Sequence, residues 1–169
     1  MGSGRNRYPR LRHMLPMQAK LLRRAIALSV EARRNGDHPF GALIAIDSEV
    51  ILEARNTVRS DGDPTAHAES NLLDLAIREL TAAELSRTVL YSSCEPCPMC
   101  AGKIYWAGVR ALVFGLSHLR LSQLASPDFK VPCRELFAKG LEVVQVTGPE
   151  LEDEAEVAHR GFWSSASGS

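Results

Sequence analysis

Residues 89–106 read VLYSSCEPCPMCAGKIYW, in which a short apolar run leads directly into a segment with two prolines and three cysteines. The apolar run, residues 89–92, predicts a buried strand. Proline is tolerated in the first turn of a helix, so the two prolines predict a helix from residue 96 to about residue 107. The stretch therefore predicts a strand followed by a helix, with Cys97 and Cys100 at the helix N-terminus.

The rest of the chain alternates between helical and β patterns in the same way. The expected helices cover residues 17–35, 66–80 and 149–162, and the expected strands cover residues 42–46, 50–54, 110–116 and 141–146. Thr65 is the expected N-cap of the second of these helices. Five strands interleaved with helices need cover on both faces, so we expect an α/β fold, a three-layer α/β/α sandwich.

The chain has 169 residues and a hydrophobic content of 45%, which suits one core and therefore one domain, placed at residues 15–163. Residues 1–14 are expected to be a disordered tail that begins with a cloning remnant, and residues 164–169 a flexible C-terminus. No apolar run reaches the roughly 20 residues that a membrane helix needs, and no secretory signal is visible. We therefore expect a soluble cytoplasmic protein.

The charges of the chain balance, with 20 Lys and Arg residues against 20 Asp and Glu residues. A net charge of zero gives no overall attraction to a polyanion. The composition therefore favours a small, weakly charged ligand over nucleic acid.

Three of the four cysteines, Cys94, Cys97 and Cys100, lie within seven residues, a spacing that suits a metal better than a disulfide framework. On the first turn of a helix, Cys97 and Cys100 can point their sulfur atoms at one ion, and the helix N-terminus stabilises thiolates. His67, two residues before Glu69, lies at the start of another expected helix and supplies a third ligand. Three protein ligands that leave a fourth position for water are the arrangement of a catalytic zinc ion.

Glu69 gives this zinc site its expected chemistry. H-x-E followed by P-C-x-x-C is the pattern of zinc-dependent deaminases, in which zinc makes a hydroxide at neutral pH and the glutamate moves the protons. Glu69 would accept a proton from the attacking water, deliver it to a ring nitrogen and help the exocyclic amine leave as ammonia. The residues therefore predict a hydrolytic deaminase.

Other interpretations of the cysteines stay open at this point. A C-x-x-C pair by itself also occurs in redox motifs and in structural zinc sites. Cys94 could join the three expected ligands in a closed Cys₃His site with no room for water. An iron–sulfur site is excluded because the position where its pattern needs a further cysteine is Ile104. Cys133 stands apart and receives no role.

Four segments together resemble the cytidine and deoxycytidylate deaminase superfamily. They are PFGA at residues 39–42, Asn56, DPTAHAE at residues 63–69 and SCEPCPMCAG at residues 93–102. The resemblance spans residues 17–116, and the block from Cys94 to Trp106 is most similar to bacterial guanine deaminases. It implies a homodimer, a mixed five-stranded sheet and a zinc cofactor. It also implies guanine as the substrate, hydrolysed to xanthine and ammonia in purine catabolism. Cytosine, triazines and other aminated heterocycles are the less favoured substrates.

The same resemblance assigns residues to the pocket. It implies that Asn56 hydrogen-bonds the base and that Phe40, Ala68 and Trp106 line the pocket. An amide presents a donor and an acceptor together, and a planar base stacks on aromatic faces, so these roles suit the residue types. Ordinary core packing is the alternative for both aromatic residues.

The chain departs from the guanine deaminase pattern in two places. Bacterial guanine deaminases use a second acid in a Gly-Phe-Asp-Asp segment, and SPDF at residues 126–129 stands roughly there. Asp128 is therefore the candidate for a second proton shuttle, with a turn residue as the alternative. Family members also close the pocket with an aromatic residue from the chain terminus. Phe162 and Trp163 are the candidates here, and packing of the last helix onto the sheet is the alternative.

Two rival functions stay open. The tRNA-specific adenosine deaminases share the DPTAHAE segment, but nucleic acid binding needs a basic surface, and the expected terminal helix at residues 149–162 is acidic. Arginines at positions 23, 24, 33 and 34 could form a local basic patch, which is the counter-argument. A zinc-stabilised binding module without catalysis is the other rival, and the presence of Glu69 argues against it.

Overall fold

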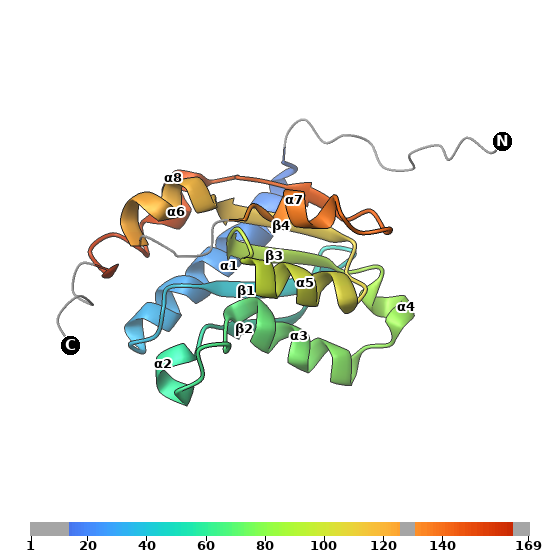
Figure 1. Cartoon of the computed structure of the whole chain (residues 1–169), viewed down its shortest axis with the longest axis horizontal. Coiled ribbons are helices and arrows are strands. Elements are labelled where there is room, and N and C mark those ends of the chain that lie inside the picture. The colour runs from blue at the N-terminus through green and yellow to red at the C-terminus, as the bar shows by residue number, and fades with distance from the viewer. Residues whose placement is uncertain (1–13, 126–130, 164–169) are drawn as a thin grey trace.

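The computed structural model describes residues 14–125 and 131–163 and is built on one five-stranded mixed sheet (Figure 1). The strands are β1 (Gly41–Ile46), β2 (Glu49–Arg55), β3 (Val89–Cys94), β4 (Ala111–Leu116) and β5 (Gln145–Thr147). Their order across the sheet is β2-β1-β3-β4-β5, so β3 is the central strand. β1 pairs antiparallel with β2 and β3, whereas the β3–β4 and β4–β5 pairs are parallel. The mixed five-stranded sheet that the resemblance implies is therefore confirmed.

Helices cover both faces of this sheet. They are α1 (Pro16–Arg34), α2 (Val58–Asp61), α3 (Ala68–Glu79), α4 (Ala82–Leu85), α5 (Pro98–Trp106), α6 (His118–Ala125), α7 (Cys133–Phe137) and α8 (Glu152–Glu156). α3, α5 and α7 pack on one face, and α1, α6 and α8 pack on the other. The predicted three-layer α/β/α sandwich is confirmed. Of the helices that the structure describes, none is long and apolar enough to cross a membrane.

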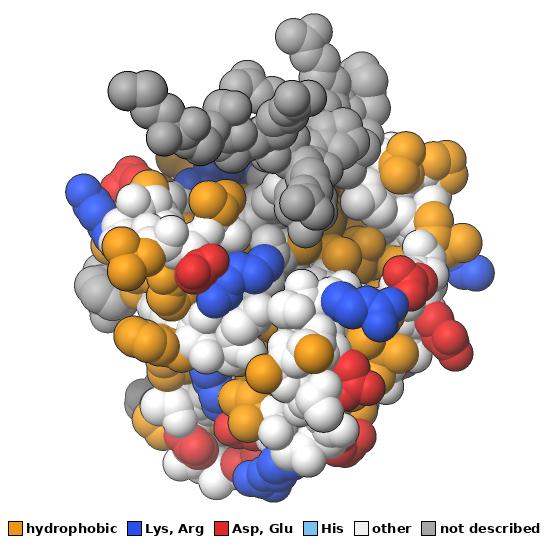
Figure 2. All heavy atoms as spheres, turned by 90° about the vertical axis from the view of Figure 1, so that its right-hand side faces the viewer, with side chains coloured by type: hydrophobic (Ala, Val, Ile, Leu, Met, Phe, Trp, Pro, Cys, Tyr) orange, Lys and Arg blue, Asp and Glu red, His pale blue; other side chains and the backbone are white. Residues whose placement is uncertain are grey.

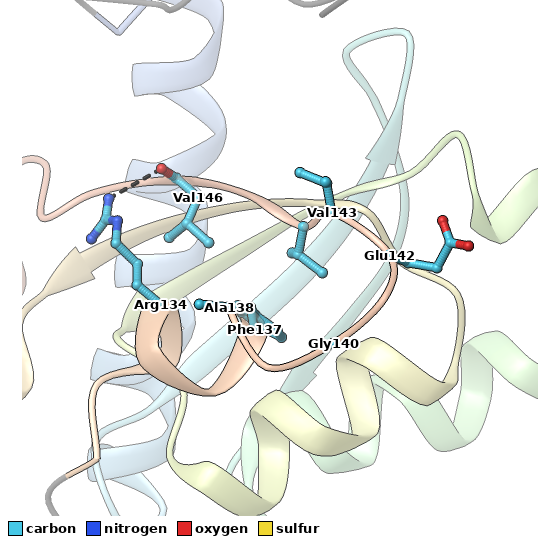
Figure 3. Close-up of a pocket in the computed structure, with 8 residues that line it drawn as sticks. Arg134, Phe137, Ala138, Gly140, Glu142, Val143 and Val146 are labelled. Carbon is cyan, nitrogen blue, oxygen red and sulfur yellow. Dashed lines mark hydrogen bonds between the residues drawn. The ribbon is translucent and has the colours of Figure 1, made fainter. Parts of the chain in front are cut away.

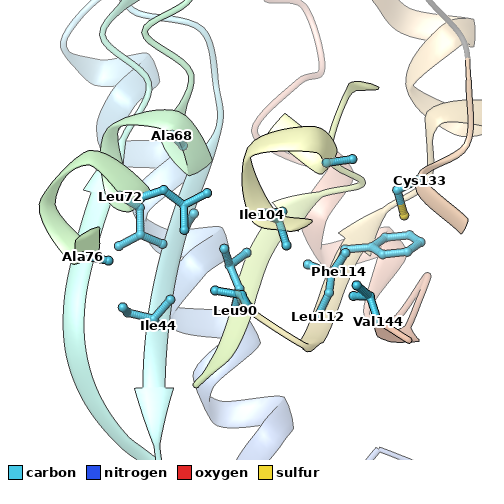
Figure 4. Packing of buried hydrophobic residues seen from close by; sticks show 14 of the residues in the cluster. Ile44, Ala68, Leu72, Ala76, Leu90, Ile104, Leu112, Phe114, Cys133 and Val144 are labelled. Carbon is cyan, nitrogen blue, oxygen red and sulfur yellow. The ribbon is translucent and has the colours of Figure 1, made fainter. Parts of the chain in front are cut away.

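The first core cluster lies between the sheet and helices α3, α5 and α7 (Figure 4). Leu72 of α3 and Ile104 of α5 pack here with Leu90 of β3 and Phe114 of β4, and all four are buried. Burial of such side chains stabilises the fold by roughly 1.5–3 kcal/mol each. The packing in this cluster therefore sets the positions of α3 and α5 relative to β3.

The second core cluster lies between the sheet and α1. Leu43 of β1 and Tyr91 of β3 belong to it. Gly41 lets the helix come close, because a Cβ atom there would lie 2.5 Å from the Leu28 Cβ atom and 2.6 Å from the Ala25 carbonyl oxygen. Successive side chains of a strand point to opposite faces. Neighbouring residues of β3 therefore pack in different core clusters, one beneath α3 and α5 and the next beneath α1.

The start of α3 differs from the prediction. The helix begins at Ala68 with His67 as its N-cap residue, so the prediction that Thr65 caps it is wrong. The Asp63 side chain accepts hydrogen bonds of 2.7 Å from both the backbone N–H and the hydroxyl of Thr65. This Asx-type turn holds Thr65 outside the helix and places His67 at the helix terminus.

The C-terminal part differs more. β5 covers three residues rather than 141–146, because the Glu142 N–H donates to the Tyr105 hydroxyl (3.1 Å) and so lies outside the strand ladder. α8 covers five residues rather than 149–162. α6 and α7 were not predicted. The expected terminal tails at residues 1–13 and 164–169 lie outside the residues that the structure describes.

Candidate zinc centre and active site

The N-termini of α3 and α5 bring three metal-ligand side chains together. His67 is the N-cap residue of α3, Cys97 is the N-cap residue of α5, and Cys100 lies in the first turn of α5. The His67 Nδ1 atom lies 3.5 Å from the Cys97 Sγ atom and 3.7 Å from the Cys100 Sγ atom. All three potential ligand atoms lie within 4.8 Å of one another. The structure thus brings together the three residues that the sequence predicts as ligands.

These distances fit a tetrahedral zinc site. Zinc binds histidine nitrogen at roughly 2.0–2.1 Å and cysteine sulfur at about 2.3 Å, and a tetrahedral angle between two such bonds separates the nitrogen and the sulfur by about 3.5 Å. The two nitrogen–sulfur separations in this structure, 3.5 and 3.7 Å, agree with that value. The residues therefore fit one zinc ion that keeps a fourth position for another ligand.

The donor set is also electrostatically suited to a cation. Hydrogen bonds from Cys100 and His67 lower the pKa of Cys97 to about 4, although burial opposes the shift. The hydrogen bond between the Cys100 thiol and the Cys97 thiolate, followed by burial, raises the pKa of Cys100. The hydrogen bond to Cys97 raises the pKa of His67, against the effect of burial. A divalent cation between the sulfurs favours both thiolates, and zinc prefers such soft donors.

Glu69 lies directly beside this triad, in the first turn of α3. It is 5% exposed, and its carboxylate interacts electrostatically with Cys97 and His67. Its Oε1 atom accepts a hydrogen bond of 2.9 Å from the Ser92 hydroxyl. Burial, followed by the negative charge of Cys97, raises the pKa of Glu69. A raised pKa makes a carboxyl group a better proton acceptor when it is ionised, which suits a group that moves protons.

Asn56 follows β2 and carries a buried amide with a free donor. Its backbone N–H donates to the Phe40 carbonyl (3.1 Å), and its Oδ1 atom accepts the Val58 N–H (3.1 Å). Its Nδ2 atom is buried and has no hydrogen-bond partner in the described part of the chain. A buried donor without a partner is destabilising, so this group is a candidate ligand contact.

The end of the described chain brings a group of aromatic rings to the segment before β1. The Trp163 ring centroid lies 5.3 Å from that of His38 and 6.1 Å from that of Phe40, and it stacks on His159 at 6.0 Å. The Trp163 Nε1–H donates to the His159 Nδ1 atom (3.3 Å). Burial lowers the pKa of His38, and the positive charges of Arg59 and His67 add to this effect. The structure therefore brings Trp163, His38 and Phe40 together.

The zinc triad, the buried glutamate and the α/β/α sandwich agree with one protein family. Residues 16–116 match the cytidine and deoxycytidylate deaminase zinc-binding region. The chain belongs to this family. It is a zinc-dependent deaminase, and His67, Cys97 and Cys100 form its zinc-binding triad.

Three relatives show how far the likeness extends. The deaminase is 40% identical to the probable cytosine deaminase of Schizosaccharomyces pombe over 148 residues, which are 84% of this chain and 90% of that protein. It is 42% identical to the guanine deaminase of Bacillus subtilis over 108 residues, 63% of this chain and 69% of that enzyme. The crystal structure of that guanine deaminase gives a TM-score of 0.60 at 40% identity, covering 66% of this chain and 70% of that one. The tRNA-specific adenosine deaminase of Bacillus subtilis is 36% identical over 94 residues, 56% of this chain and 58% of that enzyme.

The remaining predicted pocket residues of the deaminase have different positions. Trp106 ends α5, which Cys97 caps at the other end, so about 13 Å of helix separates the two. Trp106 is 86% exposed, and within this chain it is not brought to the zinc centre. Ala68 is fully buried between His67 and Glu69. Asp128 lies outside the described residues, so its role as a second proton shuttle stays a prediction, as does the homodimer.

Cys94 packs at the end of β3 and not among the ligands. It is buried in the core cluster beneath α1, and burial raises the pKa of its thiol well above the usual value. The cluster of potential metal ligands at residues 14–125 and 131–163 contains the triad and not Cys94. The closed Cys₃His alternative therefore lacks its fourth ligand. Cys133 is buried in the opposite core cluster.

Two polar residues that support the site were not predicted from the sequence. Ser92 of β3 donates to Glu69, as described above. Lys103 connects α5 to α3, because its Nζ atom donates to the Ser70 carbonyl (3.1 Å) and forms an ion pair with Asp74 (2.8 Å). Both contacts join residues more than 20 positions apart, so no local sequence pattern indicates them.

A pocket away from the zinc centre opens between α7 and β5 (Figure 3). It has a volume of about 300 Å³ and is lined mainly by apolar residues, among them Phe137 and Val143. Arg134 lies at its edge and donates to the Val146 carbonyl (3.1 Å). None of the predicted site residues lines this pocket.

Proposed function

We propose that this deaminase hydrolyses the exocyclic amino group of a free nucleobase and releases ammonia. The observation that carries the proposal is the position of Glu69, which is buried in the first turn of the helix that His67 caps, where it interacts electrostatically with His67 and Cys97. Zinc bound by the triad supplies a nucleophile derived from water at neutral pH.

Glu69 moves the protons in this reaction. Its carboxylate form accepts a proton from the attacking water, and its acid form delivers that proton to a ring nitrogen and then assists the leaving amino group. Burial is the largest cause of its raised pKa, which makes the acid form more accessible than it is for an exposed glutamate. A buried acid at this position is costly for a module that only binds zinc. This cost favours catalysis over the non-catalytic alternative.

Asn56 orients the base. Its Oδ1 atom is held by the Val58 N–H, so the amide offers its Nδ2–H donor to a ligand. We therefore expect the base to present an acceptor, such as a ring carbonyl oxygen, at this point. Cytosine and guanine both carry such an oxygen.

Phe40 and Trp163 supply an aromatic wall for the planar base. Their rings lie close together, with centroids 6.1 Å apart. Aromatic faces and edges pack well against a heterocycle. Ala68, between His67 and Glu69, is fully buried in the first core cluster and anchors the start of α3 there. Trp106 has no part in the pocket of its own chain in this proposal.

Cytosine is the first substrate to test and guanine the second, which reverses the order that the sequence motifs favour. The likeness to the probable cytosine deaminase runs through 84% of this chain and so extends beyond the zinc-binding segments, whereas the likeness to the guanine deaminase covers 63%. Small changes in pocket contacts outside the zinc ligands decide the substrate. Guanine keeps second place because the identity over its aligned part is 42%.

A tRNA substrate fits the surface less well. Arg23 pairs with Glu154 (2.8 Å) and Arg24 pairs with Glu53 (2.6 Å), so two arginines of the expected basic patch are neutralised within the chain. Basic and acidic side chains are interspersed on the face that Figure 2 shows. Affinity for nucleic acid depends on cations that contact phosphates. The ion pair with Arg23 also neutralises part of the acidic α8. The negative charge of α8 is therefore a weaker argument against RNA binding than its sequence suggests.

The test is ammonia release from a panel of substrates by the purified zinc enzyme. The panel holds cytosine, guanine, adenine, cytidine, guanosine and a tRNA anticodon stem-loop. We expect turnover of a free base, with cytosine ahead of guanine, and rates at least about 100-fold lower on nucleosides and RNA. Turnover of the stem-loop alone would contradict the proposal. Zinc binding without any turnover would favour the non-catalytic module.

A further inference from the structure

We propose that Ser92 is a positioning residue for Glu69, which its hydroxyl holds in the orientation that proton transfer needs. The inference rests on the proposed function, in which Glu69 moves the protons. The Ser92 Oγ–H donates a hydrogen bond of 2.9 Å to the Glu69 Oε1 atom. Both residues are buried, with exposed fractions of 1% and 5%, so water competes little for this contact.

The place of Ser92 in the sheet explains why its hydroxyl meets Glu69. Ser92 lies on the central strand, where it pairs with Ala42 of β1 and Phe114 of β4. Leu90, two positions earlier, faces the core beneath α3 and α5. The alternation of a strand gives Ser92 the same face. The hydroxyl therefore points from the central strand of the sheet toward the start of α3.

A serine at this position is otherwise unfavourable. Serine is not among the residues that pack well in strands, and a hydroxyl loses its contacts with water on burial. An alanine or a valine would suit the core better. The charge-assisted hydrogen bond to Glu69 offsets that loss. The polar group is thus explained by the carboxylate that it contacts.

The hydrogen bond restricts the one soft torsion that matters for the reaction. The terminal torsion of a glutamate side chain is broad, so an unanchored carboxylate can rotate. Proton transfer needs heavy atoms within roughly 2.6–3.2 Å of each other. Loss of the anchor therefore slows the proton transfers. Binding of the base through Asn56 is not affected, so kcat should fall while KM stays nearly constant.

Ser93 is a matched control on the opposite face of the same strand. Its hydroxyl is fully buried and accepts a hydrogen bond of 3.0 Å from the Gly41 N–H, on the side that packs against α1. The Ser93→Ala variant breaks one buried hydrogen bond of similar length without touching Glu69. It therefore separates a general loss of stability from a specific loss of positioning.

The experiment measures kcat, KM, zinc content and melting temperature for the holoenzyme and four variants on the best free base of the panel. We expect Ser92→Ala to lower kcat about 10- to 100-fold, with KM changed less than about twofold and one zinc per chain retained. Ser92→Thr keeps the hydroxyl and should recover kcat to within about threefold of the wild type. Ser93→Ala should keep kcat, and Glu69→Ala should be inactive.

The results that overturn the inference differ from those that overturn the proposed function. Wild-type kcat in Ser92→Ala, beside an inactive Glu69→Ala, overturns the inference alone. Equal losses of kcat in Ser92→Ala and Ser93→Ala also overturn it, because any buried hydroxyl would then matter. A folded Ser92→Thr that is as slow as Ser92→Ala counts against it in the same way. A wild-type enzyme that deaminates no base overturns the proposed function and the inference with it.

Discussion

The zinc centre and the C-terminal aromatic group differ in how the chain builds them. The zinc centre uses two helix starts, and each ligand lies at an N-cap or within one turn of it. The aromatic group joins Trp163, at the end of the described chain, to His38 and Phe40 before β1. The first arrangement is local, so its spacing is visible in the sequence. The second depends on how the last segment folds back over the sheet, and sequence spacing gives no information about it.

The largest expected effect belongs to the zinc centre, and paired cysteine variants test it. Cys97→Ser removes a ligand, so zinc content should fall well below one per chain and activity should be lost. Cys94→Ala should keep about one zinc per chain, because Cys94 packs in the core and outside the triad. Metal analysis of the two purified variants is the measurement. Loss of zinc in Cys94→Ala would show that Cys94 is a ligand and would support the closed Cys₃His site.

A smaller effect is expected at the aromatic group. Trp163→Ala removes one side of the expected wall, so KM for the base should rise about 10-fold while the zinc content stays constant. Trp106→Ala is the matched control, because Trp106 is exposed at the far end of α5. Steady-state kinetics of both variants show which of the two tryptophans contacts the base. A rise of KM in Trp106→Ala and not in Trp163→Ala would assign the pocket wall to Trp106, as the sequence resemblance implies.

The acid stability of the protein should depend on His159 of the aromatic group. Burial is the main cause that lowers the pKa of His159 to about 4, with the positive charge of Arg33 adding to it and Glu156 opposing it. In the unfolded chain the pKa is near 6.5, so between pH 6.5 and 4 the unfolded state binds more protons. The contribution of neutral His159 to the free energy of unfolding is fully present above pH 6.5. It is lost as the pH falls toward 4, by about 3 kcal/mol in total.

Denaturant unfolding across this pH range, compared with a His159→Phe variant, checks the effect. The wild type should lose more stability than the variant between pH 6.5 and 4.5. Identical pH slopes for the two proteins would show that His159 is not buried in its neutral form. The Trp163 contact described for the aromatic group would then need revision, because it uses the neutral Nδ1 atom as acceptor.

Much of the fold follows from local patterns in the sequence. The hairpin of β1 and β2, the central β3 and helices α1, α3 and α5 lie close to their predicted ranges, since each carries a clear period and clear end signals. α6 and α7 carry no such signal. The buried Glu95 accepts N–H groups at the start of both helices, from His118 (3.1 Å) and Cys133 (3.0 Å). This contact joins distant parts of the chain and has no local pattern.

The candidate site divides in the same way. His67, Glu69, Cys97 and Cys100 are predictable because helix geometry converts their spacing into proximity. Ser92 is not predictable, because a serine in a strand does not indicate which carboxylate it faces until the register and the start of α3 are known. The error at Thr65 has a similar origin. The sequence shows a good capping residue there, but the competing turn with Asp63 is stronger.

The most direct test of the central claim is the Glu69→Ala variant, with zinc content and ammonia release measured on the same preparation. The geometry predicts about one zinc per chain, because Glu69 is not a ligand, and a loss of kcat of at least about 100-fold, because Glu69 is the group that moves the protons in the proposed reaction. Normal deamination by this variant would contradict the mechanism.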